Sequence, residues 1–305
     1  MTKPRNELKS PFPYFGSKYR ITNLVWKAFG EIENYIEPFA GSLAVLLANP
    51  NIPKVETVND IDCYVSNFWR ALANDPEKVA YYADNPVNEA DMHARHRWLV
   101  GHNTEEWRTK MHSDPDFYDS KVAGWWVWGM SVSIGDSWLK TKGLNSKPIL
   151  TSAGQGVMKT SYNIEEKFLK LSARLKKVRV CSGDWKRITT PSVILKCKAM
   201  STNGIAGIFL DPPYSKNRDL VYVNDDKNVF NDVMNWAIEN GSNEKMRIIL
   251  CGYDDGYKFP DNWNKVSWKA NGGFGNLGDD RGRENSHKET IWLSPSCLAV
   301  SEADL

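Results

Sequence analysis

The sequence predicts an α/β fold, in which short buried strands alternate with amphipathic helices around one sheet. Apolar runs of strand length recur along the chain, for example over residues 204–210 and 246–251. Segments with apolar residues at helical spacing lie between such runs, most clearly over residues 164–175. Turn-forming residues close several strand-like runs, as Gly41 and Asp60 do near the N-terminus. Together these patterns indicate a sheet with helices packed against it.

Each element follows from its own local pattern. The segment NYIEPFA at 34–40 reads as a strand that stops at Gly41, and the apolar segment 42–48 as the helix after it. The helix expected over residues 228–239 ends at Asn240-Gly241, a common helix C-cap. In full, we expect strands over 34–40, 54–59, 177–181, 204–210 and 246–251, helices over 42–48, 62–73, 164–175 and 228–239, and a closing antiparallel pair over 265–270 and 289–293.

The alternation stops between about residues 84 and 160. This stretch holds a tryptophan cluster and the Gly/Ser-rich run TSAGQGV, without clear strands. A structureless loop of that length is uncommon in a compact domain, so the stretch should have a fold of its own. We therefore expect a partly helical insert over residues 84–160, on a domain built from residues 1–83 and 161–305.

Composition excludes several classes of protein. A chain of 305 residues with 41% apolar residues can bury one large core and a smaller insert. Because the formal net charge is only +2, any surface for nucleic acid must come from local clusters of basic residues. The five cysteines are dispersed without a CxxC pair, which favours reduced thiols over a zinc or redox site. The polar N-terminus and the lack of a long apolar run predict a cytoplasmic protein with no contact to a membrane.

The most informative motif is Asp211-Pro212-Pro213-Tyr214, directly after the expected strand 204–210. Ligands of open α/β sheets bind beyond the carboxyl ends of the strands. Successive prolines remove two N–H donors, so the loop presents carbonyl oxygens and a carboxylate as hydrogen-bond acceptors. Tyr214 adds an aromatic face for stacking. An acceptor-rich loop with such a face suits an extruded base that carries an amino group, and the alternative is an ordinary turn with a capping Asp.

Three further segments follow expected strands in the same way. Gly41 lies at a strand-to-helix turn, where glycine permits close approach of a ligand, or simply forms a turn. Asp60 ends the next strand, where a carboxylate can accept from ribose hydroxyls or cap a helix. Asp184 and Trp185 follow the strand at 177–181 and suit an adenine amine and ring, or a helix cap and a core tryptophan. The four motifs together place polar groups at one edge of the sheet.

The order of these motifs resembles a known enzyme family. PYFGSK, EPFAGS, VND, a long insert, SGDW and DPPY occur in the order typical of Dam-type (D12 class) adenine-specific DNA methyltransferases, including those of bacteriophages. The resemblance runs over roughly residues 10–295 and is weakest in the insert. It implies a Rossmann-like seven-stranded methyltransferase sheet with a mostly helical target-recognition insert. One departure is Leu43, which stands where the family's FxGxG loop often has a second glycine.

The resemblance also implies roles for individual residues. Lys18 would lie near the methionine carboxylate of S-adenosylmethionine, Asp60 would bind its ribose, and the segment with Asp184 would lie near its adenine. The catalytic candidates are Asp211, Pro212, Pro213 and Tyr214, which would hold the target adenine. The cofactor-binding candidates are Tyr14, Phe15, Gly16, Lys18, Glu37, Pro38, Phe39, Gly41, Ser42, Asp60, Asp184 and Trp185.

The insert supplies the candidates for DNA binding. Basic side chains commonly contact phosphates, although they can equally form a solvated helix face. The candidates are Arg95, Arg97, Lys140 and Lys142. His93 and His96 would share a helix face but lack further ligands nearby, so no metal is expected. Most of the four tryptophans Trp125, Trp126, Trp128 and Trp138 should be core residues of the insert.

The expected activity is therefore methyl transfer from S-adenosylmethionine to the N6 amine of adenine in double-stranded DNA, by a monomer. DPPY loops also occur in methyltransferases that act on other amines, so a cytosine-N4 or an RNA-base methyltransferase remains an alternative. A catalytically silent DNA-binding module of the same fold is another. A nicotinamide-dependent enzyme is disfavoured, because no GxGxxG motif follows a strand.

Overall fold

A mixed sheet forms the centre of the protein. The computed structural model describes residues 8–12, 18–114, 116–133, 138, 148–150, 163–213, 229–254, 256–268 and 289–305. Within these residues, seven strands form one sheet in the order β3-β2-β1-β4-β5-β7-β6. The strands are β1 (Asn34–Glu37), β2 (Val55–Asp60), β3 (Arg179–Ser182), β4 (Ala206–Leu210), β5 (Met246–Tyr253), β6 (Asn264–Ser267) and β7 (Glu289–Leu293). This sheet confirms the predicted Rossmann-like α/β class.

Strand direction divides the sheet into two parts. Strands β1 to β5 run parallel to one another, whereas β7 lies between β5 and β6 and is antiparallel to both. All residues of β1 and β4 are buried, as expected for parallel strands that are covered on both faces. The closing antiparallel pair predicted at the C-terminal end is confirmed as β6 and β7.

Helices cover both faces of the sheet. They are α1 (Thr22–Phe29), α2 (Ala44–Leu47), α3 (Cys63–Asn74), α4 (Pro76–Ala83), α5 (Glu89–His102), α6 (Glu105–Ser113), α7 (Ser120–Val132), α8 (Ile164–Leu175), α9 (Pro191–Ile194) and α10 (Val229–Asn240). Alternate residues of a strand point to opposite faces. Phe209 and Ile291 accordingly join the core beneath α1, whereas Ile208 and Trp292 join the core beneath α10.

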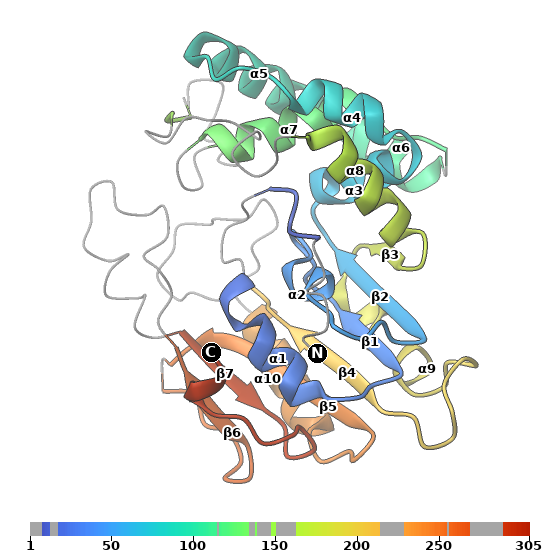
Figure 1. Ribbon diagram of the computed structural model, residues 1–305, viewed down its shortest axis with the longest axis vertical. Coiled ribbons are helices and arrows are strands. Elements are labelled where there is room, and N and C mark those ends of the chain that lie inside the picture. The colour runs from blue at the N-terminus through green and yellow to red at the C-terminus, as the bar shows by residue number, and fades with distance from the viewer. Residues whose placement is uncertain are drawn as a thin grey trace.

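Helices α3 to α8 form a helical layer at one end of the molecule, beyond β2 and β3 (Figure 1). Helix α3 contacts both of these strands and also packs against α4, α7 and α8. Three of the four tryptophans of the predicted cluster, Trp126, Trp128 and Trp138, are buried, which confirms the prediction that most of the cluster is core. Helix α7 contacts α4, so the helical layer combines segments from both sides of residue 84.

Two contacts join the helical layer to other parts of the protein, one to strand β2 and one to the N-terminal segment that holds Phe12. Arg174 of α8 donates two hydrogen bonds, of 2.7 and 2.6 Å, to the carboxylate of Glu56 on β2, and both side chains are buried. Phe12 inserts its ring among Phe68, Trp69 and Trp126, with the nearest ring centroid at 4.9 Å. The N-terminal segment is thereby anchored in the helical layer. Among the described residues, no helix is both long enough and apolar enough to cross a bilayer.

Candidate active site

The site lies where the order of the strands reverses. The chain proceeds from β1 to β2 and β3 on one side, and from β4 to β5 on the other, so β1 and β4 are neighbours at a topological switch point. Ligands of open α/β sheets bind in the crevice at the carboxyl ends of such strands. Glu37 is the last residue of β1, and Asp211 directly follows β4. The sheet topology therefore brings two of the predicted site residues to the position expected for a ligand.

A buried ion pair occupies this position. Lys18 Nζ lies 2.9 Å from Asp211 Oδ1, and the two side chains are only 3% and 19% exposed. Burial raises the pKa of Asp211 to about 6, although the charge of Lys18 and its hydrogen bond oppose this shift. Burial lowers the pKa of Lys18, but the charges of Asp211 and Glu289 outweigh it and leave that pKa above its ordinary value. The lysine is therefore a fixed positive charge beside a carboxylate that titrates near neutrality.

Two further carboxyl groups lie near this pair. Glu37 is buried and accepts a 3.0 Å hydrogen bond from the hydroxyl of Tyr35. Burial raises the pKa of Glu37 well above its ordinary value, and the neighbouring charge of Asp211 raises it further. Glu289, the first residue of β7, is also buried, and its charge acts on both Lys18 and Asp211. We assigned no role to Glu289 from the sequence, because only the folded sheet brings β7 close to β4.

The loop after β1 has the backbone conformation of a glycine-rich loop. Gly41 has φ of 46° and Leu43 has φ of 57°, both in the left-handed region. Leu43 thus takes the conformation that a glycine adopts easily, at the position of the second glycine in the FxGxG pattern. Its side chain is fully buried, which offsets the strain of that backbone conformation. Leu43 therefore keeps, in this chain, the left-handed backbone conformation that a glycine would favour at this position.

Asp60 holds this loop in place. Its two carboxylate oxygens accept hydrogen bonds of 2.9 Å from the backbone N–H groups of Gly41 and Asp62. The cap of α3 is Asp62, whose side chain accepts from the N–H of Tyr64. A carboxylate offers about four acceptor positions, so Asp60 keeps acceptor capacity for further donors. This arrangement fits a ligand with vicinal hydroxyl groups, such as a ribose.

Asn59 positions the loops on either side of Asp60, and we did not single it out from the sequence. Its side-chain amide donates to the carbonyl oxygens of Pro38, at 3.1 Å, and Gly183, at 2.8 Å. The indole N–H of Trp69 adds a 3.3 Å hydrogen bond to the carbonyl oxygen of Gly41. The signal in the sequence was the VND triplet, in which a buried Asn precedes the carboxylate. Both residues fix the backbone around the candidate cofactor site.

The segment SGDW lies at the rim of the site. Asp184 is exposed and caps a short 3-10 turn by accepting from the N–H of Lys186 at 2.8 Å. Trp185 is buried, with its ring centroid 6.3 Å from that of Phe39. The structure thus gives these residues the arrangement of a cap and a core tryptophan. Their contacts with the adenine of a cofactor stay a prediction.

The other predicted site residues fall into two groups. Pro38, Ser42 and Pro212 are buried, and Pro213 is half-buried, at the same edge of the sheet as Asp211. Tyr14, Phe15, Gly16, Tyr214, Lys140 and Lys142 lie outside the described residues.

The candidates for DNA binding on α5 differ in exposure. The side chain of Arg95 is 12% exposed, donates to Asn85 at 3.0 Å and lies 4.3 Å above the ring of Trp128. Its guanidinium is therefore engaged in packing within the helical layer. Arg97 on the same helix is exposed. DNA binding stays a prediction for both residues.

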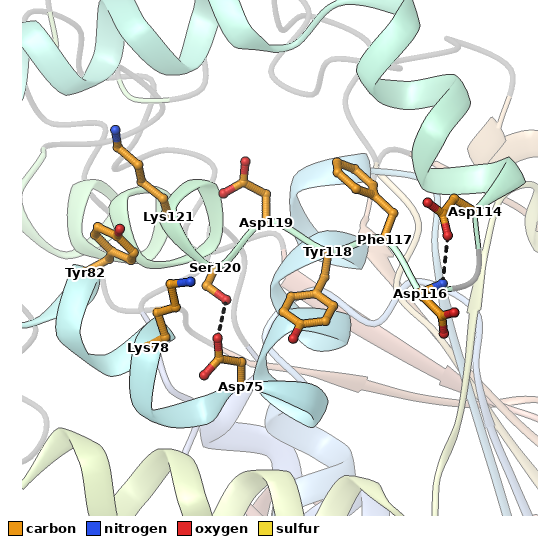
Figure 2. A pocket seen from close by; sticks show the side chains of 10 residues that line it. All are labelled: Asp75, Lys78, Tyr82, Asp114, Asp116, Phe117, Tyr118, Asp119, Ser120 and Lys121. Atoms are coloured by element: carbon orange, nitrogen blue, oxygen red, sulfur yellow. Dashed lines mark hydrogen bonds between the residues drawn. The ribbon is translucent and has the colours of Figure 1, made fainter.

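A separate pocket of about 490 Å³ lies in the helical layer, between α4 and the start of α7 (Figure 2). Its lining combines aspartates with two lysines and three aromatic side chains, and the hydroxyl of Ser120 donates to Asp75 at 3.2 Å. None of the predicted site residues lines this pocket. Within the described part of the chain, no group of three acidic, histidine or cysteine side chains could hold a metal ion.

Part of the chain matches a known family. Residues 14–116 match the family model of the D12 class N6 adenine-specific DNA methyltransferases. The match contains Lys18, the loop after β1 and Asp60, and it ends before Asp211. No curated protein sequence matches the chain at a significant level. The family match supports the resemblance seen in the order of motifs, and the sheet topology is consistent with the methyltransferase fold.

Proposed function

We propose that this protein is an S-adenosylmethionine-dependent DNA methyltransferase of the Dam type, which modifies the exocyclic N6 amine of adenine. The observation that carries the proposal is the place of Asp211, a buried carboxylate paired with Lys18 at the switch point and followed directly by two prolines. The family match over residues 14–116 supports it independently, because the matched stretch does not include Asp211.

The candidate cofactor side of the site lies along β1 and β2. The remaining acceptor capacity of Asp60 suits ribose hydroxyls, and the left-handed turn at Gly41 permits close approach of a ligand. The half-buried ring of Phe39 offers apolar surface at the rim, and the buried indole of Trp185 lies beside it. When bound, S-adenosylmethionine supplies the methyl group as an electrophile, so the protein has only to position the acceptor amine.

Asp211 would prepare that amine. Above about pH 6 its carboxylate is ionised and accepts hydrogen bonds from an amino group. Together with the carbonyl oxygen of Pro212, it would orient the nitrogen lone pair and stabilise the positive charge that develops on nitrogen. Lys18 would hold the carboxylate in place from the other side. Tyr214 would stack on the base after it has been flipped out of the duplex.

The test is a product analysis. The protein is incubated with unmethylated double-stranded DNA and S-adenosylmethionine, and the DNA is digested to nucleosides for mass spectrometry. We expect N6-methyladenine from the wild type and none from Asp211→Ala. Detection of N4-methylcytosine instead would show that the target base is cytosine. An RNA substrate treated in parallel tests whether the enzyme acts on RNA. Absence of methylated base from all substrates would favour the silent DNA-binding module.

A further inference from the structure

A second pocket, of about 660 Å³, opens at the amino ends of the parallel strands, at the end of the sheet opposite to Asp211. Its walls come from the loops before β1, β2 and β4, from the start of β5 and from the segment after β7. Every residue that lines this amino-end pocket belongs to the described part of the chain. The surface around it can therefore be read from its own side chains.

Aliphatic side chains meet at the amino-end pocket. Ile52 is 53% exposed and Leu298 is 46% exposed, and the half-buried Ile32 and Ile205 line the pocket with them. Single exposed apolar side chains are common on protein surfaces, whereas several around one hollow are typical of a contact surface. The backbone N–H of Leu298 donates to the carbonyl oxygen of Ala28 at 2.9 Å, so this segment is held against the end of α1.

Arg247 brings a positive charge to the same pocket. Its Nε donates to the carbonyl oxygen of Ser296 at 3.1 Å, and its Nη1 donates to the carbonyl oxygens of Phe29 and Glu31. These bonds hold the guanidinium in place but supply no opposite charge. Within the described residues, Arg247 forms no ion pair and Nη2 makes no hydrogen bond, so this nitrogen keeps two N–H donors for a further acceptor.

Glu31 brings a negative charge. Its side chain is exposed, and its carboxylate has neither an ion-pair nor a hydrogen-bond partner in the part of the chain that the structure describes. The other carboxylate of the lining, Glu33, is already paired with Lys54 at 2.9 Å. The amino-end pocket thus combines an aliphatic centre with one open positive and one open negative group.

We propose that the amino-end pocket is the contact surface between two copies of this chain, related by a twofold axis. In such a contact the same surface faces itself, so each group needs its complement within one patch. Arg247 of one copy would meet Glu31 of the other, and the reverse pair would form on the other side of the axis. Ile52 and Leu298 would lose their exposure to water between the two copies.

The balance of charge is what favours a second copy. A surface for nucleic acid would carry an excess of basic side chains, and this pocket has no such excess. The contact lies away from Asp211 and Asp60, so it leaves both copies of the candidate active site uncovered. The inference goes beyond the proposed function, does not depend on it, and replaces the monomer expected from the sequence.

The experiment is sedimentation velocity of the full chain, without cofactor or DNA, over protein concentrations from about 1 to 100 µM. The wild type is expected to form a dimer whose fraction rises with concentration. Leu298→Asp and Ile52→Asp each bury a carboxylate in the contact twice, and should weaken the dimer at least about tenfold. Because both side chains are largely exposed in the single chain, thermal unfolding followed by circular dichroism should change little.

Two further variants make the test specific. Glu31→Lys places like charges opposite each other and should also weaken the dimer at least about tenfold, while the backbone carbonyl that accepts from Arg247 stays in place. Leu169→Asp makes the same change as Leu298→Asp at a leucine of α8 that is 43% exposed and does not line the pocket. That control should leave the dimer unchanged.

Two results would overturn the inference. The first is a wild type that sediments as a monomer at every concentration. The second is a dimer that persists unchanged in Leu298→Asp, Ile52→Asp and Glu31→Lys, because such a dimer uses another surface. The three substitutions lie in separate loops, so the others decide if one variant fails to fold. Failure to find methylated DNA would remove the proposed function and leave this result as it stands.

Discussion

Lys18 and Asp211 form a buried ion pair with 2.9 Å between Nζ and Oδ1, although 193 positions separate them along the chain. One residue comes from the segment before α1 and the other from the loop after β4. The pair joins the first part of the family match to the DPPY loop that lies beyond it. Within the pair, the charge of Lys18 lowers the pKa of Asp211, the carboxylate to which we assign the central role.

We expect the acid limb of the pH profile to depend on Lys18. Asp211 must be ionised to accept from an amine, so kcat/KM should fall about tenfold per unit as the pH drops below about 6. Lys18 lowers the pKa of Asp211, so Lys18→Met should raise that pKa and move the acid limb to higher pH. Lys18→Arg keeps the charge and should show little movement. If the acid limb does not move in Lys18→Met, the limb does not arise from the ionisation of Asp211.

Asp60 and Asp62 provide a matched pair of variants. Asp60→Ala removes the acceptor that holds the N–H of Gly41, so S-adenosylmethionine should bind at least about tenfold more weakly, by calorimetry. Asp62→Ala removes the cap of α3 and should cost about 1 kcal/mol of unfolding free energy, with little change in affinity. Unchanged affinity in Asp60→Ala would contradict its assignment to the ribose.

Leu43 offers a test of backbone strain. At a left-handed position alanine is strained and glycine is not, so Leu43→Gly should be more stable than Leu43→Ala by about 1 kcal/mol. Leu46, three residues further along in α2, gives the control. It is equally buried but helical, so Leu46→Gly should be less stable than Leu46→Ala by about 1 kcal/mol. Urea denaturation measures all four variants, and the same order at both positions would contradict the strain at Leu43.

The buried pair of Arg174 and Glu56 should contribute to stability without affecting chemistry. Removing one partner, as in Arg174→Met or Glu56→Gln, leaves the other charge or its donors buried, and should cost about 3–5 kcal/mol. The double variant should cost clearly less than the sum of the single ones, which a double-mutant cycle in urea measures. Activity per folded molecule should stay at the wild-type level. Additive losses would show that the two side chains do not interact energetically.

Much of the sheet could be predicted from local patterns. The strand predicted over 204–210 is β4, and the strand predicted over 246–251 is β5, each within two residues at either end. Their apolar runs are long enough to be distinctive because both faces of a parallel sheet are buried. Helix α1 was not predicted, because eight residues carry too little periodicity to stand out.

The candidate site was predicted only where a motif follows a strand. Asp60 and Asp211 were found because each ends a recognisable strand and belongs to a family motif. Glu289 was missed because its approach to Asp211 depends on the pairing of β7 with β5, a contact that no local pattern encodes. The burial of Arg95 could not be foreseen either, because it depends on the packing of α5 against α7.

The anchoring of Phe12 has a mechanical consequence. Phe12 packs in the helical layer and Lys18 pairs with Asp211 at the end of β4, and a chain of this length can span at most about 21 Å when fully extended. The intervening residues therefore act as a short tether between the layer that carries Arg97 and the carboxylate at the end of β4. Any movement of the helical layer relative to the sheet is limited by that tether. A displacement of Phe12 that extends this segment fully would act directly on Lys18, and through Lys18 on Asp211.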